Sequence, residues 1–249
     1  MQQLFTLPNR PQSAVDAEQS RDITIKAESS EVMLTRTRGV LDFLGLNDVP
    51  AIPCGGTIIP DGLPHAFYPD PRVLFAAMGK KLSPRDFSAV CLQLLDHYGD
   101  GIGDWLRGRL SSSLVKPDPT NLKGWSSGTF TEEDGHINVY ERGFSPITRF
   151  QTGEEVYNLP ARDGRKPLLD AGATPGSLLE WAISFALFPD LKAEIVRVDP
   201  WVVHPGTRVR SGVYGWSLVS YCWEIRGRAK CGDCWGDYVY PKDALFSLL

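Results

Sequence analysis

Three of the five cysteines lie close together near the end of the chain, at Cys222, Cys231 and Cys234. The last two form a C-x-x-C pair, a spacing found in zinc sites and in redox-active thiol pairs. A structural zinc site takes four ligands, so this pair needs further side chains. Cys222 and His204, with Cys54 as a more distant candidate, could supply them. One hypothesis is therefore a metal-stabilised module that binds zinc or iron through Cys222, Cys231, Cys234 and His204, although our main expectation is that the protein has no cofactor.

The position of the hairpin turn decides whether these thiols meet. A Gly-Asp pair occupies positions 232–233 and is typical of a two-residue turn. That turn would place the two cysteines of the C-x-x-C pair opposite each other and leave Cys222 about 30 Å away, at roughly 3.3 Å per residue. A turn near Gly227-Arg228 would instead bring Cys222 opposite Cys234. We favour the turn at 232–233, in which the cysteines are structural thiols.

A second alternative is an enzyme whose site is assembled from distant residues. The segment 124–128 matches the G-x-S-x-G pattern of serine hydrolases, but it lacks the preceding strand and following helix that the nucleophile elbow requires. We interpret it as a flexible loop. If the chain is a hydrolase-like enzyme, Cys54 and His65 in the Pro- and Gly-rich loop 49–71, together with Asp199 and His204, are the candidate catalytic residues.

Tryptophan and tyrosine are concentrated in the final fifty residues. These side chains are enriched in protein interfaces because they bury a large area and keep a polar tip. They also fill the cores of curved sheets, which is the competing interpretation. Taken as an interface, the pattern predicts partner-binding residues at Trp216, Tyr221, Trp223, Trp235 and Tyr238.

Composition narrows the function classes. The chain has 249 residues, is 42% hydrophobic and 22% charged, and carries a formal net charge of −4. A general nucleic-acid-binding protein needs a basic face, so we do not expect one here. No apolar run approaches the roughly 18 residues that span a membrane, and the N-terminus lacks the order of a signal peptide. We therefore expect a cytoplasmic protein with no membrane partner.

Helix signals are strongest in the first half of the chain. Asp70-Pro71 and Ser83-Pro84 each combine an N-cap residue with proline at the first helical position. After the second, apolar side chains recur at the spacing of a core-facing helix. Thr174-Pro175 is a similar start for a later apolar helix. The predicted helices cover residues 31–44, 71–79, 84–98, 104–112 and 176–188.

Strand signals dominate the second half. Asp134-Gly135 between alternating runs predicts a hairpin, and the segments 193–198 and 211–226 predict strands. Residues 1–20 are polar and predict a loose arm. Together these features predict an α+β fold: a mostly antiparallel sheet packed against three to four helices. The domain would cover residues 21–249, with a helix-rich part at 31–115 and a strand-rich part at 125–249.

The functional expectation is a non-catalytic, cytoplasmic protein that binds another protein. An inhibitor of the immunity type and a subunit of a larger assembly both fit the mild acidity and the aromatic-rich sheet. The enzyme and the metal-stabilised module remain the alternatives.

Overall fold

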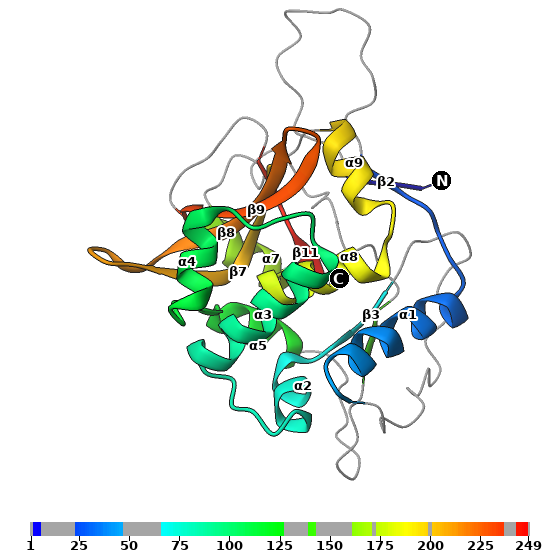
Figure 1. Ribbon diagram of the computed structural model, residues 1–249, viewed down its shortest axis with the longest axis horizontal. Coiled ribbons are helices and arrows are strands. Elements are labelled where there is room, and N and C mark those ends of the chain that lie inside the picture. The colour runs from blue at the N-terminus through cyan, green and yellow to red at the C-terminus, as the bar shows by residue number, and fades with distance from the viewer. Residues whose placement is uncertain are drawn as a thin grey trace, which may run out of the picture.

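A computed structural model of the chain shows an α+β fold in which helices pack against a central sheet (Figure 1). Most of the described helices come from the N-terminal half of the chain, and the C-terminal third supplies the long strands. The residues that the structure describes are 2–5, 23–46, 66–126, 139–142, 161–170, 173–198, 201–236 and 243–248.

The predicted helices are confirmed. Ser83 accepts a hydrogen bond from the amide of Asp86 at the start of α3, and Gly99 ends that helix. The one-sided apolar stripe of α3 is buried, as its spacing predicts. The described helices are α1 (Ser30–Phe43), α2 (Pro71–Ala77), α3 (Pro84–Tyr98), α4 (Asp104–Ser111), α5 (Pro119–Ser126), α7 (Ala161–Asp170), α8 (Leu178–Leu187) and α9 (Leu191–Val198).

The main sheet has the strand order β10-β7-β8-β9, and β4 also pairs with β7. All of its pairs are antiparallel except β10 with β7, so the sheet is mostly antiparallel, as expected. Its strands are β4 (Val115–Pro117), β7 (Trp201–Ser211), β8 (Gly215–Ile225), β9 (Arg228–Trp235) and β10 (Asp243–Leu245). Three small pairs join β1 (Gln2–Phe5) to β2 (Ile23–Ile25), β3 (Ala66–Pro69) to β5 (Val139–Arg142), and β6 (Thr174–Pro175) to β11 (Ser247–Leu248).

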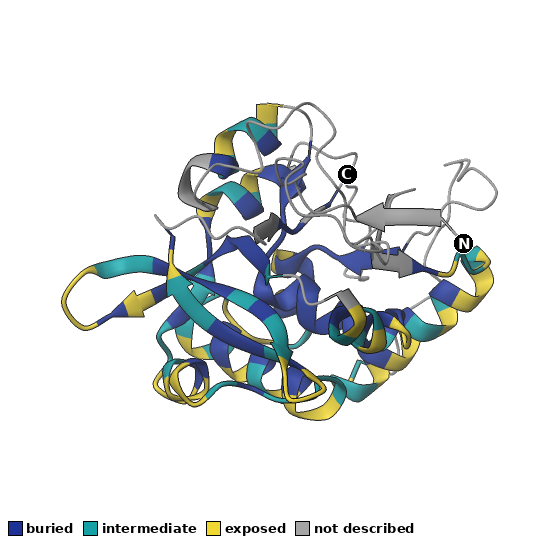
Figure 2. Cartoon of the chain, turned by 90° about the horizontal axis from the view of Figure 1, so that it is seen from above, coloured by how far each residue is buried: buried dark blue, intermediate teal, exposed yellow. Residues whose placement is uncertain are grey.

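The two faces of the sheet are covered differently. One face packs against helices that include α3, α4, α8 and α9 and forms the large hydrophobic core. On the other face, Val203 and Val219 pack with Leu168 of α7 and with Leu245 in a second, smaller cluster. Figure 2 shows the buried interior and the β7–β8 hairpin that projects from it with an exposed tip.

The predicted turn at Gly232-Asp233 is wrong. Strand β9 runs through both residues, and the β8–β9 turn lies at Arg226-Gly227. Both turn residues have positive φ, 54° and 74°, which is the geometry of the I′ turns that match strand twist. The observed turn lies one position before the alternative near Gly227-Arg228, and it places Cys222 opposite Cys231 rather than Cys234.

Two other sequence predictions are also wrong. The segment predicted as a strand at 193–198 belongs to helix α9, where Leu191 and Ile195 bury one face. Helix α8 does not start at Thr174-Pro175, which forms β6. It starts after Ser177, whose side chain and that of Glu180 form a capping box.

Several predictions concern residues outside the described ranges. The Asp134-Gly135 hairpin and most of the 1–20 arm lie there, although residues 2–5 of the arm form β1. Among the helices that the structure describes, none combines the length and the apolar character needed to cross a bilayer.

Candidate interaction surface

Four large hydrophobic side chains remain exposed around one end of the main sheet. They are Trp105 on α4, Val213 and Tyr214 at the tip of the β7–β8 hairpin, and Trp235 at the end of β9, with exposed fractions of 77%, 83%, 65% and 36%. Elsewhere in the described residues, only Val32 and Ile225 are exposed large hydrophobics. Clustered exposed apolar side chains mark interaction sites more often than scattered ones do.

The hairpin tip has a defined conformation. Gly215 adopts a φ of 64°, which favours glycine, and pairs with Ser211 to close the turn. The amide of Tyr214 donates a 2.9 Å hydrogen bond to Oγ of Ser211. The Tyr214 ring then packs edge-to-face against Trp235, with ring centroids 4.8 Å apart. Local hydrogen bonding therefore positions the tyrosine against the neighbouring strand.

Arg109 connects the helix side of this surface to the sheet. Its guanidinium lies 6.0 Å from the ring centroid of Trp105, one helical turn earlier. Its Nε is 3.9 Å from Oδ2 of Asp233 on β9. Asp233 and Trp235 are two residues apart in a strand and so point to the same face. The arginine thus links Trp105 on α4 to the strand that carries Trp235. With Trp105 it lines a shallow hollow of about 340 Å³.

Asp233, the ion-pair partner of Arg109, is an unusual carboxylate. Its side chain is only 5% exposed, and its Oδ1 makes no hydrogen bond to the described residues. Burial raises the pKa of Asp233, and the positive charge of Arg109 only partly opposes this shift. At 3.9 Å the ion pair is longer than a hydrogen bond, so neither charge is fully compensated.

Most of the remaining predicted partner-binding residues already pack within the molecule. On the opposite face of the sheet, Tyr221 stacks between Trp201 and Trp223, with centroid distances of 4.9 and 4.6 Å. These three rings are half-buried, and each ring face in the stack is covered by its neighbour. Trp216 is half-buried and lies 4.3 Å from the ammonium of Lys116. Trp235 is therefore the predicted residue that lies on the exposed surface, while Tyr238 lies outside the described residues.

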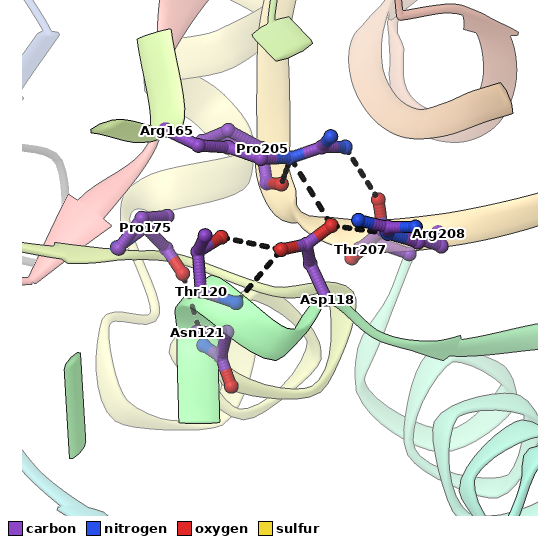
Figure 3. A network of polar contacts seen from close by, with 8 residues as sticks. All are labelled: Asp118, Thr120, Asn121, Arg165, Pro175, Pro205, Thr207 and Arg208. Carbon is purple, nitrogen blue, oxygen red and sulfur yellow. Dashed lines mark hydrogen bonds and ion pairs between the residues drawn. The ribbon is translucent and has the colours of Figure 1, made fainter. Parts of the chain in front are cut away.

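A buried polar network fixes the base of the β7–β8 hairpin (Figure 3). Asp118 follows β4, accepts hydrogen bonds from the amide and Oγ1 of Thr120 at 2.8 and 2.5 Å, and so begins helix α5. The same carboxylate accepts a hydrogen bond from Nε of Arg208 on β7 and lies 3.4 Å from Nε of Arg165 on α7. Arg165 also donates to the carbonyl of Pro205 at 2.6 Å.

This network carries an excess of positive charge, because two guanidinium groups contact one carboxylate. Burial alone would raise the pKa of Asp118, but the charge of Arg165 and the hydrogen bonds from Thr120 and Arg208 outweigh it and lower the pKa. Asp118 is wholly buried, and its oxygens are occupied by these donors. The network therefore joins α5, α7 and β7, and its carboxylate is not an open ligand site. Nothing in the sequence pattern indicated it, because its members come from three separate segments.

Of the candidate catalytic residues, His204 alone lies within the described part of the chain. His204 is wholly buried, its Nδ1 lies 2.9 Å from Oγ of Ser220, and its ring packs 5.0 Å from Trp181. Burial lowers the pKa of His204 to about 3, so the imidazole is neutral. Its position is the large core rather than a surface pocket. Cys54, His65 and Asp199 lie outside the described residues.

The G-x-S-x-G segment has a different structure from the one predicted. Positions 124–126 form the end of helix α5 instead of a flexible loop, and Trp125 is wholly buried. Its Nε1 donates a 2.9 Å hydrogen bond to the carboxylate of Glu180. A nucleophile elbow places serine between a strand and a helix, so these positions do not match it.

The cysteines proposed as metal ligands do not gather at one point. Cys222 and Cys231 are paired across β8 and β9 and are both wholly buried. Cys234 lies three residues further along β9 and points to the other face of the sheet. Within the part of the chain that the structure describes, no group of three or more His, Cys, Asp or Glu side chains is arranged to hold a metal ion.

No protein-family model, no curated protein and no solved structure matches this chain.

Proposed function

We propose that the chain is a protein-binding protein and that its partner docks on the hairpin-end surface, defined as Trp105, Arg109, Val213, Tyr214 and Trp235. The observation that carries this proposal is the concentration of exposed large hydrophobic side chains at one end of an otherwise well-buried fold. A soluble domain exposes such clusters at a cost in solubility, and they commonly mark interfaces.

The residue types support protein binding in particular. Tryptophan, tyrosine and arginine supply most of the energetic hot spots in protein interfaces. Here Tyr214 is packed against Trp235, and Trp105 is packed beside Arg109. Side chains that are already held in place lose less conformational entropy when a partner covers them. The surface is therefore suited to be the centre of an interface.

Both kinds of protein-binding protein expected from the sequence, an inhibitor and an assembly subunit, would use such a surface. An inhibitor of the immunity type would place these side chains against an enzyme, and an assembly subunit would place them against a neighbouring subunit. In either case the hollow beside Trp105 would accept a side chain of the partner. The second aromatic group, Trp201 with Tyr221 and Trp223, is less suited because its ring faces are already occupied.

The test compares two matched variants in an affinity capture from the native host's extract. Trp105→Ala combined with Tyr214→Ala removes two exposed aromatics of the hairpin-end surface. Ile225→Ala removes an exposed hydrophobic side chain at the other end of the β8 strand. A captured protein is identified by mass spectrometry, purified and titrated against each form by calorimetry.

The proposal expects the double variant to weaken binding at least about tenfold, since each hot spot contributes more than about 1 kcal/mol. The Ile225→Ala variant should bind like the wild type. Equal binding by all three forms, or an equal loss in both variants, would overturn the assignment of the surface.

A further inference from the structure

Cys222 and Cys231 occupy directly opposed positions in the middle of the β8–β9 pair. Both belong to the large core, and both are wholly buried. Opposed residues of an antiparallel pair point to the same face of the sheet, so the two thiols share one side. Burial, together with the Cys231 thiol, raises the pKa of the Cys222 thiol, as expected for two thiols that lie close together.

The backbone hydrogen bonds of Cys231 show whether Cys222 and Cys231 form a hydrogen-bonded or a non-hydrogen-bonded pair of the antiparallel ladder. Its amide donates a 3.2 Å hydrogen bond to the carbonyl of Gly101, and its carbonyl accepts a 2.6 Å hydrogen bond from the amide of Gly103. Both backbone groups thus point away from β8 toward the loop before α4. Cys222 and Cys231 are therefore a non-hydrogen-bonded pair, the class in which opposed Cα atoms approach to about 4.5 Å and side chains lie closest. That spacing is within the roughly 4.4–6.8 Å that a disulfide spans.

We propose that Cys222 and Cys231 are a modification site, at which a cross-strand disulfide forms when the chain folds in the presence of a small-molecule disulfide. Cys234 is the closest other cysteine in sequence, but it points to the opposite face of β9. The register therefore selects Cys222, and not Cys234, as the partner of Cys231.

The reaction is two successive thiol–disulfide exchanges. The thiolate of one cysteine attacks a sulfur of the small-molecule disulfide, forms a mixed disulfide and expels one small thiolate. The second cysteine thiolate then attacks the protein sulfur of that mixed disulfide and expels the second small thiolate. The protein loses two electrons and two protons, and the small molecule is reduced to two thiols, which take up those protons.

The burial of the pair sets the time at which the reaction happens. Burial raises the pKa of the Cys222 thiol well above its usual value, so the folded protein contains little of the attacking thiolate. Exchange is therefore expected while β8 and β9 are still accessible, before the core closes. Once formed, the bond would be protected from reducing agents in the same way.

The test unfolds the reduced chain and refolds it in a buffer of oxidised and reduced glutathione, with a parallel sample in reduced glutathione alone. Free thiols are alkylated, and the protein is digested with trypsin. Cleavage after Arg226 and Lys230 puts Cys222 and Cys231 in different peptides, while Cys231 and Cys234 stay in one peptide. The two disulfide pairings therefore give different products. Cys234→Ser is the matched control, because it leaves Cys231 as the one cysteine in its peptide.

The proposal expects a linked pair of peptides containing Cys222 and Cys231 in the wild type and in Cys234→Ser. It also expects the oxidised protein to melt about 5–10 °C higher than the reduced protein, because the bond closes a short loop of the unfolded chain. A bond within the Cys231–Cys234 peptide, full alkylation of these cysteines in folded protein, or a lower melting temperature after oxidation would each overturn it.

Discussion

The buried carboxylate of Asp118 accepts a hydrogen bond from the guanidinium of Arg208, which lies 90 positions further along the chain. This contact joins the end of β4 to the strand from which the exposed hairpin projects. Arg165 adds a second guanidinium 3.4 Å from the same carboxylate. A single side chain thus connects a strand end, a helix start and the base of the candidate surface.

Replacing Asp118 with alanine should lower the free energy of unfolding by about 3–5 kcal/mol, because it leaves two partly buried guanidinium groups without their carboxylate. Urea denaturation monitored by circular dichroism measures this change. Asp118→Asn keeps the size of the side chain and can still accept from Thr120, so it should cost less than alanine. A loss below about 1 kcal/mol in the alanine variant would show that the network contributes little.

The same network predicts acid sensitivity. The pKa of Asp118 is lower in the folded protein than its usual value of 3.8. Its contribution to stability is therefore complete above the unfolded pKa and is lost as the pH falls through the lower, folded-state pKa. Acid titrations of the wild type and of Asp118→Asn should converge below that range. If the two curves stay parallel down to the acid limit, Asp118 is not the group responsible.

Because of His204, the stability of the protein should fall as the pH is lowered from 6.5 to about 3. Its pKa falls from 6.5 to about 3 on burial, so in this window the unfolded chain binds a proton that the folded chain does not. Unfolding is therefore favoured as the pH falls, by about 2 kcal/mol between pH 7 and pH 5. The measurement is the free energy of unfolding at both pH values in the wild type and in His204→Gln.

The glutamine variant lacks the titrating imidazole, so its stability should change less between the two pH values than that of the wild type. The other histidines also titrate in this range, but their effect on stability is the same in both proteins and cancels in the comparison. An identical pH dependence in the two proteins would contradict the assignment to His204.

Gly232 should tolerate no side chain. A Cβ atom there would lie 2.7 Å from Cζ3 and 2.9 Å from Cη2 of Trp223. Gly232→Ala would displace this ring from its stack with Tyr221 and should cost about 1–3 kcal/mol. Gly212→Ala is the control, because a Cβ at that position meets no atom within 4 Å and should change stability by less than about 0.5 kcal/mol. Thermal melts of the two variants compare the costs, and equal stability would show that the ring moves freely.

Asp233→Asn should stabilise the protein at pH 7. Because the pKa of Asp233 is raised by burial, ionising this group costs more in the folded chain than in the unfolded chain. Stability should therefore fall as the pH rises from the unfolded pKa through the folded pKa, and the neutral asparagine should avoid that fall. Urea denaturation at pH 7 and pH 4 should show a gain at pH 7 that becomes smaller at pH 4. A loss of stability at pH 7 would mean that the ion pair with Arg109 outweighs the burial cost.

Local signals predicted the helices best. In α3 the cap at Ser83, the following proline and the apolar spacing all indicate the same element, and its end at Gly99 was also predicted. Where local preference was ambiguous, tertiary packing decided. The Ile and Val residues near position 195 favour a strand, but burial of Leu191 and Ile195 on one side makes the segment a helix.

The hairpin turn was mispredicted because a more typical turn pair was available. Gly232-Asp233 resembles common turn sequences, whereas Arg226 places a long side chain at positive φ, which is unusual. Full pairing of β8 with β9 along their length outweighs that local cost. The sequence also did not indicate the hairpin-end surface as a whole. Trp235 was predicted from its residue type, but Trp105 and Arg109 join it only through the packing of α4 on β9.

The loop before α4 covers part of the outer edge of β9. The outward amide of Cys231 donates a hydrogen bond to the carbonyl of Gly101, and its outward carbonyl accepts one from the amide of Gly103. The carboxylate of Asp100 accepts a 3.4 Å hydrogen bond from the amide of Ala229. Outward backbone groups of an edge strand are the template on which foreign strands add and aggregates grow. Here the protein supplies its own partner for them. This stretch of β9 is therefore closed to β-augmentation, and a protein that binds nearby must recognise side chains rather than extend the sheet.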